Sequence, residues 1–237
     1  MCNIIKLNKN DILINIVRRN IESKDYKTAI SILEKIDDKK YHILKLLLEL
    51  YLIEEYSYNK VVKVLKNMFL FKDLNSFEAT LIIKKIKESK RNGVLFFFIR
   101  RSISVFSTDP FFKIELVKLL INNSKYKLSY NLLKDFKRFL SPENYMFYRA
   151  YILREKNKRL RSMFYFYKLV KNYPFNIVYR YFFSCLLEEL NLVKTSKKHI
   201  NFIKDFIKFI PKIINYDPDD IGFKKFIFKT IWDDFSY

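Results

Sequence analysis

The amino-acid sequence predicts an all-α protein: an α-solenoid of about six antiparallel helical hairpins with a C-terminal capping helix. Three observations predict it. Only 2 Gly and 5 Pro occur among 237 residues, too few for the turns of a many-stranded β-protein. Apolar residues recur at i, i+3 and i+4 through most of the chain, which is the period of a helix. Short polar breaks return every 32 to 38 residues, the length of one helical hairpin.

These breaks define the expected elements. They centre near Lys24-Asp25, Ser57, Lys90-Arg91, Lys125, Asn157 and Thr195. The hairpins are therefore expected at 10–37, 40–71, 75–106, 110–140, 142–173 and 175–215. A last helix, expected at 219–236, carries Phe223, Ile227, Ile231 and Trp232 and would cover the open end of the array as a C-terminal cap.

Several expected helices begin at residues suited to a helix N-terminus. Asn75 to Glu78 has the pattern of a capping box, in which the Asn75 side chain accepts from the Glu78 amide and Glu78 reaches back. Asp109-Pro110 and Ser141-Pro142 each place a capping oxygen before a proline at the first helical position. Asp217-Pro218 repeats this pattern before the last helix.

The chain is expected to form one body over residues 1–237, because no Pro/Gly/Ser-rich linker divides it. The longest apolar run, Val94 to Ile99, has six residues, against roughly 20 for a membrane-spanning helix. The first residues lack the apolar core of a signal peptide, so the expected compartment is the cytoplasm.

The charge of the chain admits two interpretations. Lys and Arg number 46 against 25 Asp and Glu, a formal net charge of +21. Such an excess attracts nucleic acid, anionic lipid or acidic proteins. However, the chain is also rich in Lys, Asn, Ile, Phe and Tyr together, as expected from AT-biased coding, where lysine serves as a general solubilising residue. Both interpretations stay open at this point.

Residues 142–174 resemble a tetratricopeptide repeat. They place small Ala150 in the first helix, small Ser162 and then Phe166 in the second, and Pro174 after it. Ser184 follows Ala150 by 34 residues, the repeat length of that family. Asp25 to Ile30, with Ala29 as the small residue, resembles the start of a second helix in such a repeat, and Ser57 to Val61 echoes it. Arg149 departs from the pattern, since it stands where the family buries a leucine.

The resemblance implies a right-handed superhelix whose first helices line a concave groove that holds a peptide or a partner helix. Another α-solenoid or an irregular helical bundle is the alternative fold. Projecting the repeat geometry onto this chain puts Phe147, Tyr151 and Arg154 on the groove side of one first helix and Tyr181 on the next. These four are the candidate partner-binding residues, with Arg154 expected to pair with an acidic group.

The sequence contains no pattern typical of catalysis. His42 and His199 are the only histidines and lie far apart, and the cysteines are Cys2 and Cys185. A glycine-rich phosphate loop, a nucleophile elbow and the usual zinc motifs are all missing. We therefore expect no enzyme activity, no cofactor and no metal site.

The fifth hairpin combines charge and aromatic rings more densely than the rest of the chain. Residues 141–174 hold eight Lys or Arg against Glu143 and Glu155, a net charge of +6. Aromatic residues lie among them, including Tyr145, Tyr148, Phe164, Tyr165 and Tyr167. This composition suits an acidic peptide, or single-stranded nucleic acid, unless most rings pack in the interior. The sequence thus favours a protein-binding scaffold, with a nucleic-acid-associated protein as the alternative.

Overall fold

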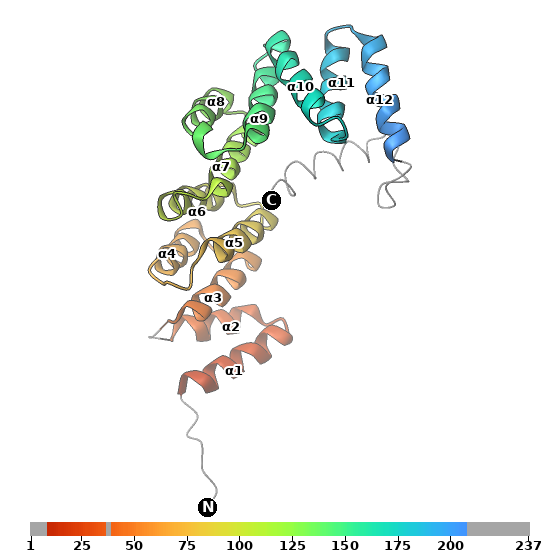
Figure 1. Cartoon of the computed structure of the whole chain (residues 1–237). Helices are drawn as coiled ribbons and strands as arrows, with labels where there is room; N and C mark the ends of the chain where they lie inside the picture. Colours follow the sequence, from red (N-terminus) through yellow and green to blue (C-terminus); the bar gives the residue numbers. More distant parts are fainter. Residues whose placement is uncertain (1–8, 37–38, 208–237) are drawn as a thin grey trace, which may run out of the picture. The chain divides into compact units, whose positions relative to one another are not determined.

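A computed structural model of the chain describes residues 9–36 and 39–207. Within these ranges it contains twelve α-helices, one short 3-10 helix and no strand (Figure 1). The helices fall into two compact units, Met1–Ser107 (unit 1) and Thr108–Tyr237 (unit 2), and each unit is described by itself. The all-α prediction is confirmed. The expected capping helix at 219–236 and its Asp217-Pro218 start lie outside the described residues, and the single body over 1–237 stays a prediction.

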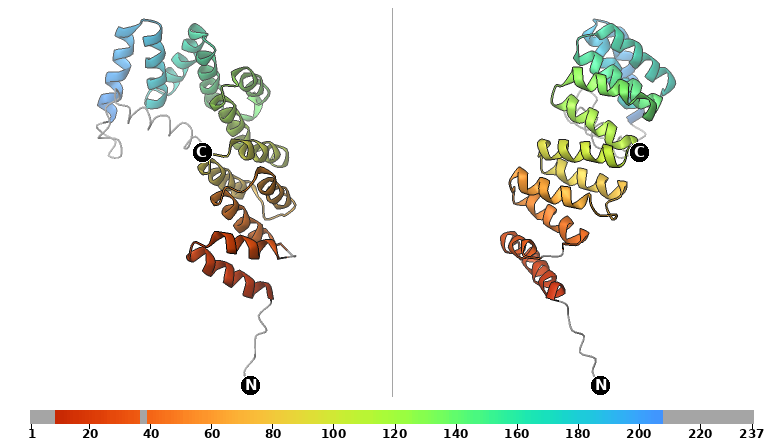
Figure 2. Two further views of the ribbon diagram at one scale, coloured as in Figure 1. Left: turned by 180° about the vertical axis from the view of Figure 1, so that it is seen from behind. Right: turned by 90° about the vertical axis from the view of Figure 1, so that its left-hand side faces the viewer.

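Unit 1 consists of three helical hairpins. They are α1 (Lys9–Glu22) with α2 (Tyr26–Glu34), α3 (Tyr41–Ile53) with α4 (Tyr58–Met68), and α5 (Ser76–Glu88) with α6 (Asn92–Val105). In the right-hand view of Figure 2, α3 to α6 lie in successive layers. The core of the unit is mainly aliphatic, with buried Leu33, Leu44, Leu47, Leu65 and Ile82.

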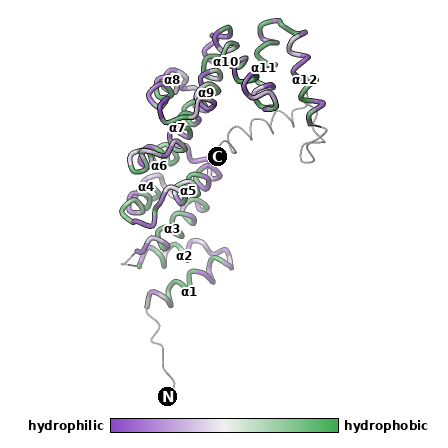
Figure 3. The backbone as a smooth tube through the Cα atoms, in the orientation of Figure 1, coloured by the Kyte–Doolittle hydropathy of each residue, from purple (hydrophilic) through white to green (hydrophobic). Residues whose placement is uncertain are grey.

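Unit 2 also consists of three hairpins. They are α7 (Pro110–Asn122) with α8 (Tyr126–Asp135), α9 (Pro142–Glu155) with α10 (Arg159–Asn172), and α11 (Ile177–Glu189) with α12 (Val193–Ile207). The 3-10 helix η1 (Lys137–Phe139) follows α8. The six hairpins of the described residues therefore lie where the recurring polar breaks predict them, and the end of the sixth expected range, 208–215, lies outside those residues. Hydrophobic and hydrophilic residues alternate along the helices of both units (Figure 3), as the helical period requires.

One residue in each hairpin turn adopts a left-handed backbone conformation. The residues are Lys24, Glu55, Lys90, Ser124, Asn157 and Asn191, with φ between 53° and 61°. After α9, for example, the Lys158 amide donates to Leu153 O and the Asn157 amide to Arg154 O, both at 2.8 Å. This pair of bonds is the Schellman motif, which satisfies the last carbonyls of a helix and reverses the chain.

The predicted helix caps are largely confirmed. The side chains of Asn75, Asp109 and Ser141 accept from the amides of Glu78, Phe111 and Asn144 at 2.9, 2.9 and 3.1 Å. The second half of the capping box is wrong, because Glu78 does not reach back to Asn75. Its carboxylate accepts a hydrogen bond from Lys45 on α3 at 2.7 Å instead, since an ion pair with the neighbouring hairpin is available there.

The small residues behind the family resemblance lie at close helix contacts. Ala29, Ala150, Ser162 and Ser184 are all fully buried. The Ser162 hydroxyl on α10 donates to the Ala150 carbonyl on α9 at 2.8 Å, so the two helices approach within hydrogen-bond distance. Ser196 on α12, which follows Ser162 by one repeat length, is likewise buried.

Candidate functional site

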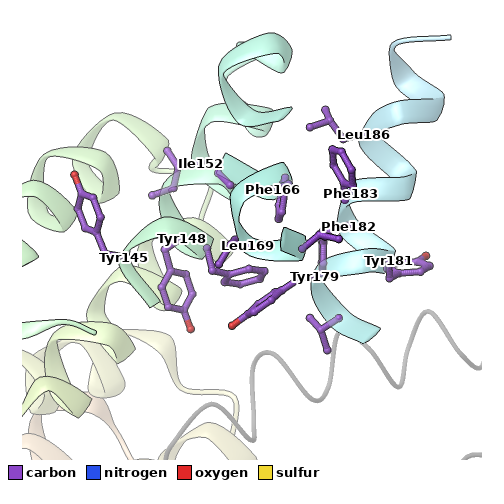
Figure 4. Packing of buried hydrophobic residues seen from close by; sticks show 14 of the residues in the cluster. Tyr145, Tyr148, Ile152, Phe166, Leu169, Tyr179, Tyr181, Phe182, Phe183 and Leu186 are labelled. Carbon is purple, nitrogen blue, oxygen red and sulfur yellow. The ribbon is translucent and has the colours of Figure 1, made fainter. Parts of the chain in front are cut away.

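Phe147, one of the four predicted partner-binding residues, lies in the core of unit 2. It is 1% exposed. Its ring contacts Phe166 of α10 and Tyr179 and Phe182 of α11, with centroids 6.2, 5.5 and 5.7 Å away. The predicted partner-binding role of Phe147 is corrected here, because its ring is buried against the neighbouring helices. Figure 4 shows how Phe166, Tyr179 and Phe182 gather in this cluster.

The two predicted tyrosines differ in their surroundings. Tyr151 is half-buried and its ring lies 5.6 Å from that of Phe182. Burial raises the pKa of its hydroxyl to about 12. Tyr181 lies on the other side of α11 from Phe166 and Tyr148 (Figure 4) and is only 5% exposed. Neither ring is freely exposed.

Arg154 already has an acidic partner within the chain. Its Nε donates to Glu189 Oε1 of α11 at 2.9 Å, and its Nη2 contacts the same oxygen. Arg159 Nε lies 3.6 Å from the other oxygen of Glu189. The acidic group expected for Arg154 is thus supplied by the next hairpin.

Similar polar contacts join the first helices of consecutive hairpins in both units. In unit 1, Lys85 of α5 pairs with Glu49 of α3, in addition to the Lys45–Glu78 pair. In unit 2, the Tyr179 hydroxyl of α11 donates to Glu143 of α9 at 2.6 Å. These contacts and the Arg154–Glu189 pair link consecutive hairpins. Their recurrence assigns the first-helix polar residues a structural role.

A different surface of the fifth hairpin has an open cleft. It has a volume of about 400 Å³ and lies between α8, α9 and α10. We call it the tyrosine–arginine cleft. Its walls are formed by Tyr130, Arg149, Leu153, Leu160, Arg161, Phe164 and Tyr165. It therefore combines two guanidinium groups with aromatic and aliphatic side chains.

Three tyrosine rings surround the Arg149 guanidinium. Its Cζ atom lies 4.7, 5.6 and 5.9 Å from the ring centroids of Tyr165, Tyr145 and Tyr130. Its Nη1 donates to the Tyr145 hydroxyl at 2.9 Å. No carboxylate of the described residues pairs with it. Arg149 is held by cation–π contacts and keeps its full charge.

An apolar stripe runs along α10 beside the cleft. Leu160, Phe164 and Tyr167 are 70%, 52% and 55% exposed. Their spacing of four and three residues puts them on one face of the helix. Lys168 Nζ lies 4.3 Å from the centre of the Phe164 ring, so the stripe carries positive charge at its side.

Sequence reasoning found part of this surface. The density of Arg and aromatic residues in 141–174 is visible in the sequence, as is the departure of Arg149 from the repeat pattern. The contribution of Tyr130 from the preceding hairpin was missed. A tyrosine in the middle of the preceding second helix, 19 residues before an unusual arginine, is the signal that could have found it.

Two other kinds of site are absent from the described residues. No helix there is both long and apolar enough to cross a membrane. No group of three or more His, Cys, Asp or Glu side chains that could hold a metal ion occurs in the same ranges.

Comparisons with known proteins support the repeat architecture. No family model and no curated protein matches the chain. Among solved structures, the C-terminal part of a TPR repeat-containing protein from Cytophaga hutchinsonii is similar, with a TM-score of 0.50 and 10% identity over 83% of this chain and 85% of that one. MamA from Desulfovibrio magneticus RS-1 (41-end) aligns at 12% identity over 86% of this chain and 98% of its own, with a TM-score of 0.38. The similarity to the Cytophaga hutchinsonii structure shows a tetratricopeptide-like fold, as the residue pattern predicts.

Proposed function

We propose that the chain is a scaffold that binds a partner protein through the fifth hairpin of unit 2. The observation that carries this proposal is the apolar stripe of Leu160, Phe164 and Tyr167, exposed on one face of α10. Exposed aromatic and aliphatic side chains in a continuous row are typical of protein contact surfaces. No catalytic step belongs to this proposal.

Charge at the same place defines the chemistry of the partner. Arg161 and Lys168 lie on α10 with the stripe, and Arg149 lies in the cleft beside it. Cations around an apolar surface steer an acidic partner toward it and exclude basic ones. The proposed partner is therefore an acidic protein segment with apolar side chains that cover the stripe.

The four residues predicted for the first-helix face have a different role in this proposal. Phe147 and Tyr151 pack against the rings of α11, and Arg154 is neutralised by Glu189. They hold the fifth and sixth hairpins together and so keep α10 in place. The proposed contact surface lies on α10 instead of on the first helices.

A nucleic-acid partner is the second candidate, favoured by the net charge of +21. Binding of single strands depends on bases that stack on free aromatic faces. Here the protein's own cations stack on the rings, with Lys168 over Phe164, Arg149 over Tyr165, and Lys134 over Tyr130 at 4.9 Å. Fewer ring faces are left for bases, so the protein partner is favoured.

A pull-down from native lysate, with and without nuclease, tests the proposal. The baits are the full chain, the double variant Phe164→Ser with Tyr167→Ser, and the control Phe77→Ser. Phe77 of unit 1 is exposed to a similar degree, at 69%, so the control removes a comparable ring elsewhere. We expect the parent and the control to retain the same proteins after nuclease and the double variant to lose them.

Two results would contradict the proposal. Retention of the same proteins by the double variant would place the contact elsewhere. Loss of every retained protein from the parent after nuclease treatment would favour the nucleic-acid candidate instead. The double variant should keep the helix content of the parent, because both side chains are exposed.

A further inference from the structure

We infer that the tyrosine–arginine cleft is an anion-accepting pocket in which Arg149 and Arg161 hold a carboxylate side chain of the partner. This inference rests on the proposed function, because the carboxylate belongs to the same acidic segment that covers the apolar stripe. It adds a specific contact and a specific pair of residues to that proposal.

The chemistry of the cleft walls suits an anion. Two of its seven lining residues are arginines, and none is acidic. Arg161 is exposed at the mouth of the cleft and pairs with no carboxylate of the described residues. The two guanidinium groups therefore present positive charge that no wall residue offsets. A carboxylate fits them well, because its two oxygens match the fork of donors on a guanidinium.

Arg149 contrasts with Arg154 on the same helix. Arg154 lies beside Glu189 and its charge is compensated. Arg149 is half-buried among tyrosine rings, and its Nη1 donates to the neutral Tyr145 hydroxyl. Withdrawing a charge from water without a counter-ion costs solvation energy. A bound carboxylate would offset part of that solvation cost. The Arg149 guanidinium therefore favours an anion more than an exposed arginine does.

The size and the apolar walls of the cleft fit a side chain of a peptide. A volume of about 400 Å³ lies within the range of small ligand pockets and accommodates an acidic side chain with part of its neighbour. Leu160 and Phe164 form the outer wall and belong to the apolar stripe. A bound segment would cover them, exclude water and strengthen the ion pair beneath.

The experiment measures binding of defined probes to the full chain by fluorescence anisotropy at about 150 mM salt, where surface charges are screened beyond about 8 Å. The main probe is a dye-labelled peptide in which Asp alternates with Leu and Phe. The matched probes are the same peptide with Asn in place of Asp, and labelled oligothymidine of equal length. The variants are Arg149→Gln and Arg161→Gln, with Arg18→Gln as a control. Arg18 is an exposed arginine on α1, so its loss changes the net charge equally.

We expect each cleft variant to bind the acidic peptide at least about tenfold more weakly than the parent, the size of effect for a lost charge-assisted hydrogen bond. The Arg18→Gln variant should bind nearly as well as the parent. The Asn peptide should bind weakly to all of them. Arg161 is exposed, so the Arg161→Gln result does not depend on any packing role of Arg149, and circular dichroism checks the helix content of both.

Four results would overturn the inference. The Asn peptide binding as tightly as the Asp peptide would exclude a carboxylate site. Equal losses in Arg161→Gln and Arg18→Gln would show that only net charge matters. Oligothymidine displacing the peptide from the parent but not from the cleft variants would assign the cleft to nucleic acid. If the cleft variants bind normally while the Phe164→Ser and Tyr167→Ser pair still loses its partner proteins, the anion site fails and the scaffold stands.

Discussion

Units 1 and 2 build the same hairpin architecture from different side chains. The largest fully buried side chains include seven aromatic residues, and all but Phe98 belong to unit 2. Unit 1 fills its core mainly with Leu, Ile and Val. Since both cores support three hairpins, the architecture depends on the period and on close helix contacts more than on the type of apolar residue. The aromatic composition of unit 2 continues onto its surface, where it forms the proposed contact site.

The largest expected effect follows from truncating the core ring Phe147. Replacing it with alanine should destabilise unit 2 by about 3–5 kcal/mol, since a large buried ring leaves a cavity that cannot fully collapse. Leu47→Ala should cost about 2–5 kcal/mol in unit 1. Denaturant unfolding combined with hydrogen exchange would assign each loss to its own unit.

The control for this comparison is Phe164→Ala, which removes a half-exposed ring of the same unit and should change the free energy of unfolding little. If Phe147→Ala were equally harmless, Phe147 would be a surface residue, as the repeat projection first placed it. A residue other than Phe147 would then lie at the centre of the aromatic core of unit 2.

The comparison of Phe147 with Phe164 also shows what the sequence could predict. The hairpins follow from local signals, such as the distance from Ala150 to Ser184 and the capping residues Asp109 and Ser141. The repeat projection gives the direction in which a side chain leaves its helix, but not what covers it. Phe147 points toward α11, whose rings fill the space. No local pattern in the sequence predicts the contact between Phe147 and the rings of α11.

The tyrosine–arginine cleft was also predictable only in part, because local signals are visible in the sequence and contacts between hairpins are not. Arg149 is conspicuous in the sequence because a charge stands at a position that normally packs. Its neighbours Tyr145 and Tyr165 lie within the same hairpin and follow from helical spacing. Tyr130 comes from the preceding hairpin, and its approach to Arg149 depends on how two hairpins stack. Such stacking is a tertiary property that periodicity alone does not specify.

A second substitution tests the close helix contact in unit 2. Ala150→Trp should destabilise the unit by about 1–3 kcal/mol, because Ala150 is fully buried and its carbonyl lies 2.8 Å from the Ser162 hydroxyl. Leu160→Trp, at an exposed position of the facing helix, is the matched control. Unchanged thermal stability of the Ala150 variant would remove the contact on which the family resemblance mainly depends.

A third comparison concerns the ion pairs that join first helices. A double-mutant cycle on Arg154 and Glu189 should give a coupling of about 1 kcal/mol, because the arginine donates from two nitrogens and both side chains are less than a third exposed. Lys45 with Glu78 in unit 1 has a single donor at 2.7 Å and should give about half as much. Equal couplings, measured by denaturant unfolding, would show that donor geometry does not distinguish the two units.

The smallest expected effect concerns the left-handed turn residues, where the units again differ. Unit 1 uses Lys24, Glu55 and Lys90, while unit 2 uses Ser124, Asn157 and Asn191. A left-handed conformation is strained for most side chains, but asparagine tolerates it and glycine is free of the strain. Lys24→Gly should therefore stabilise unit 1 by about 0.5–1 kcal/mol, after the entropy that glycine adds to the unfolded chain is subtracted.

Asn157→Gly should stabilise unit 2 by only a few tenths of a kcal/mol at most, because asparagine is already suited to the turn. Lys24→Gln is the control, since it removes the charge of Lys24 and retains a side chain in the strained conformation. The measurement is the free energy of denaturant unfolding, with hydrogen exchange near each turn. A larger gain for Asn157→Gly than for Lys24→Gly would contradict the strain argument. The turns of unit 1 would then tolerate lysine for a reason other than the backbone conformation.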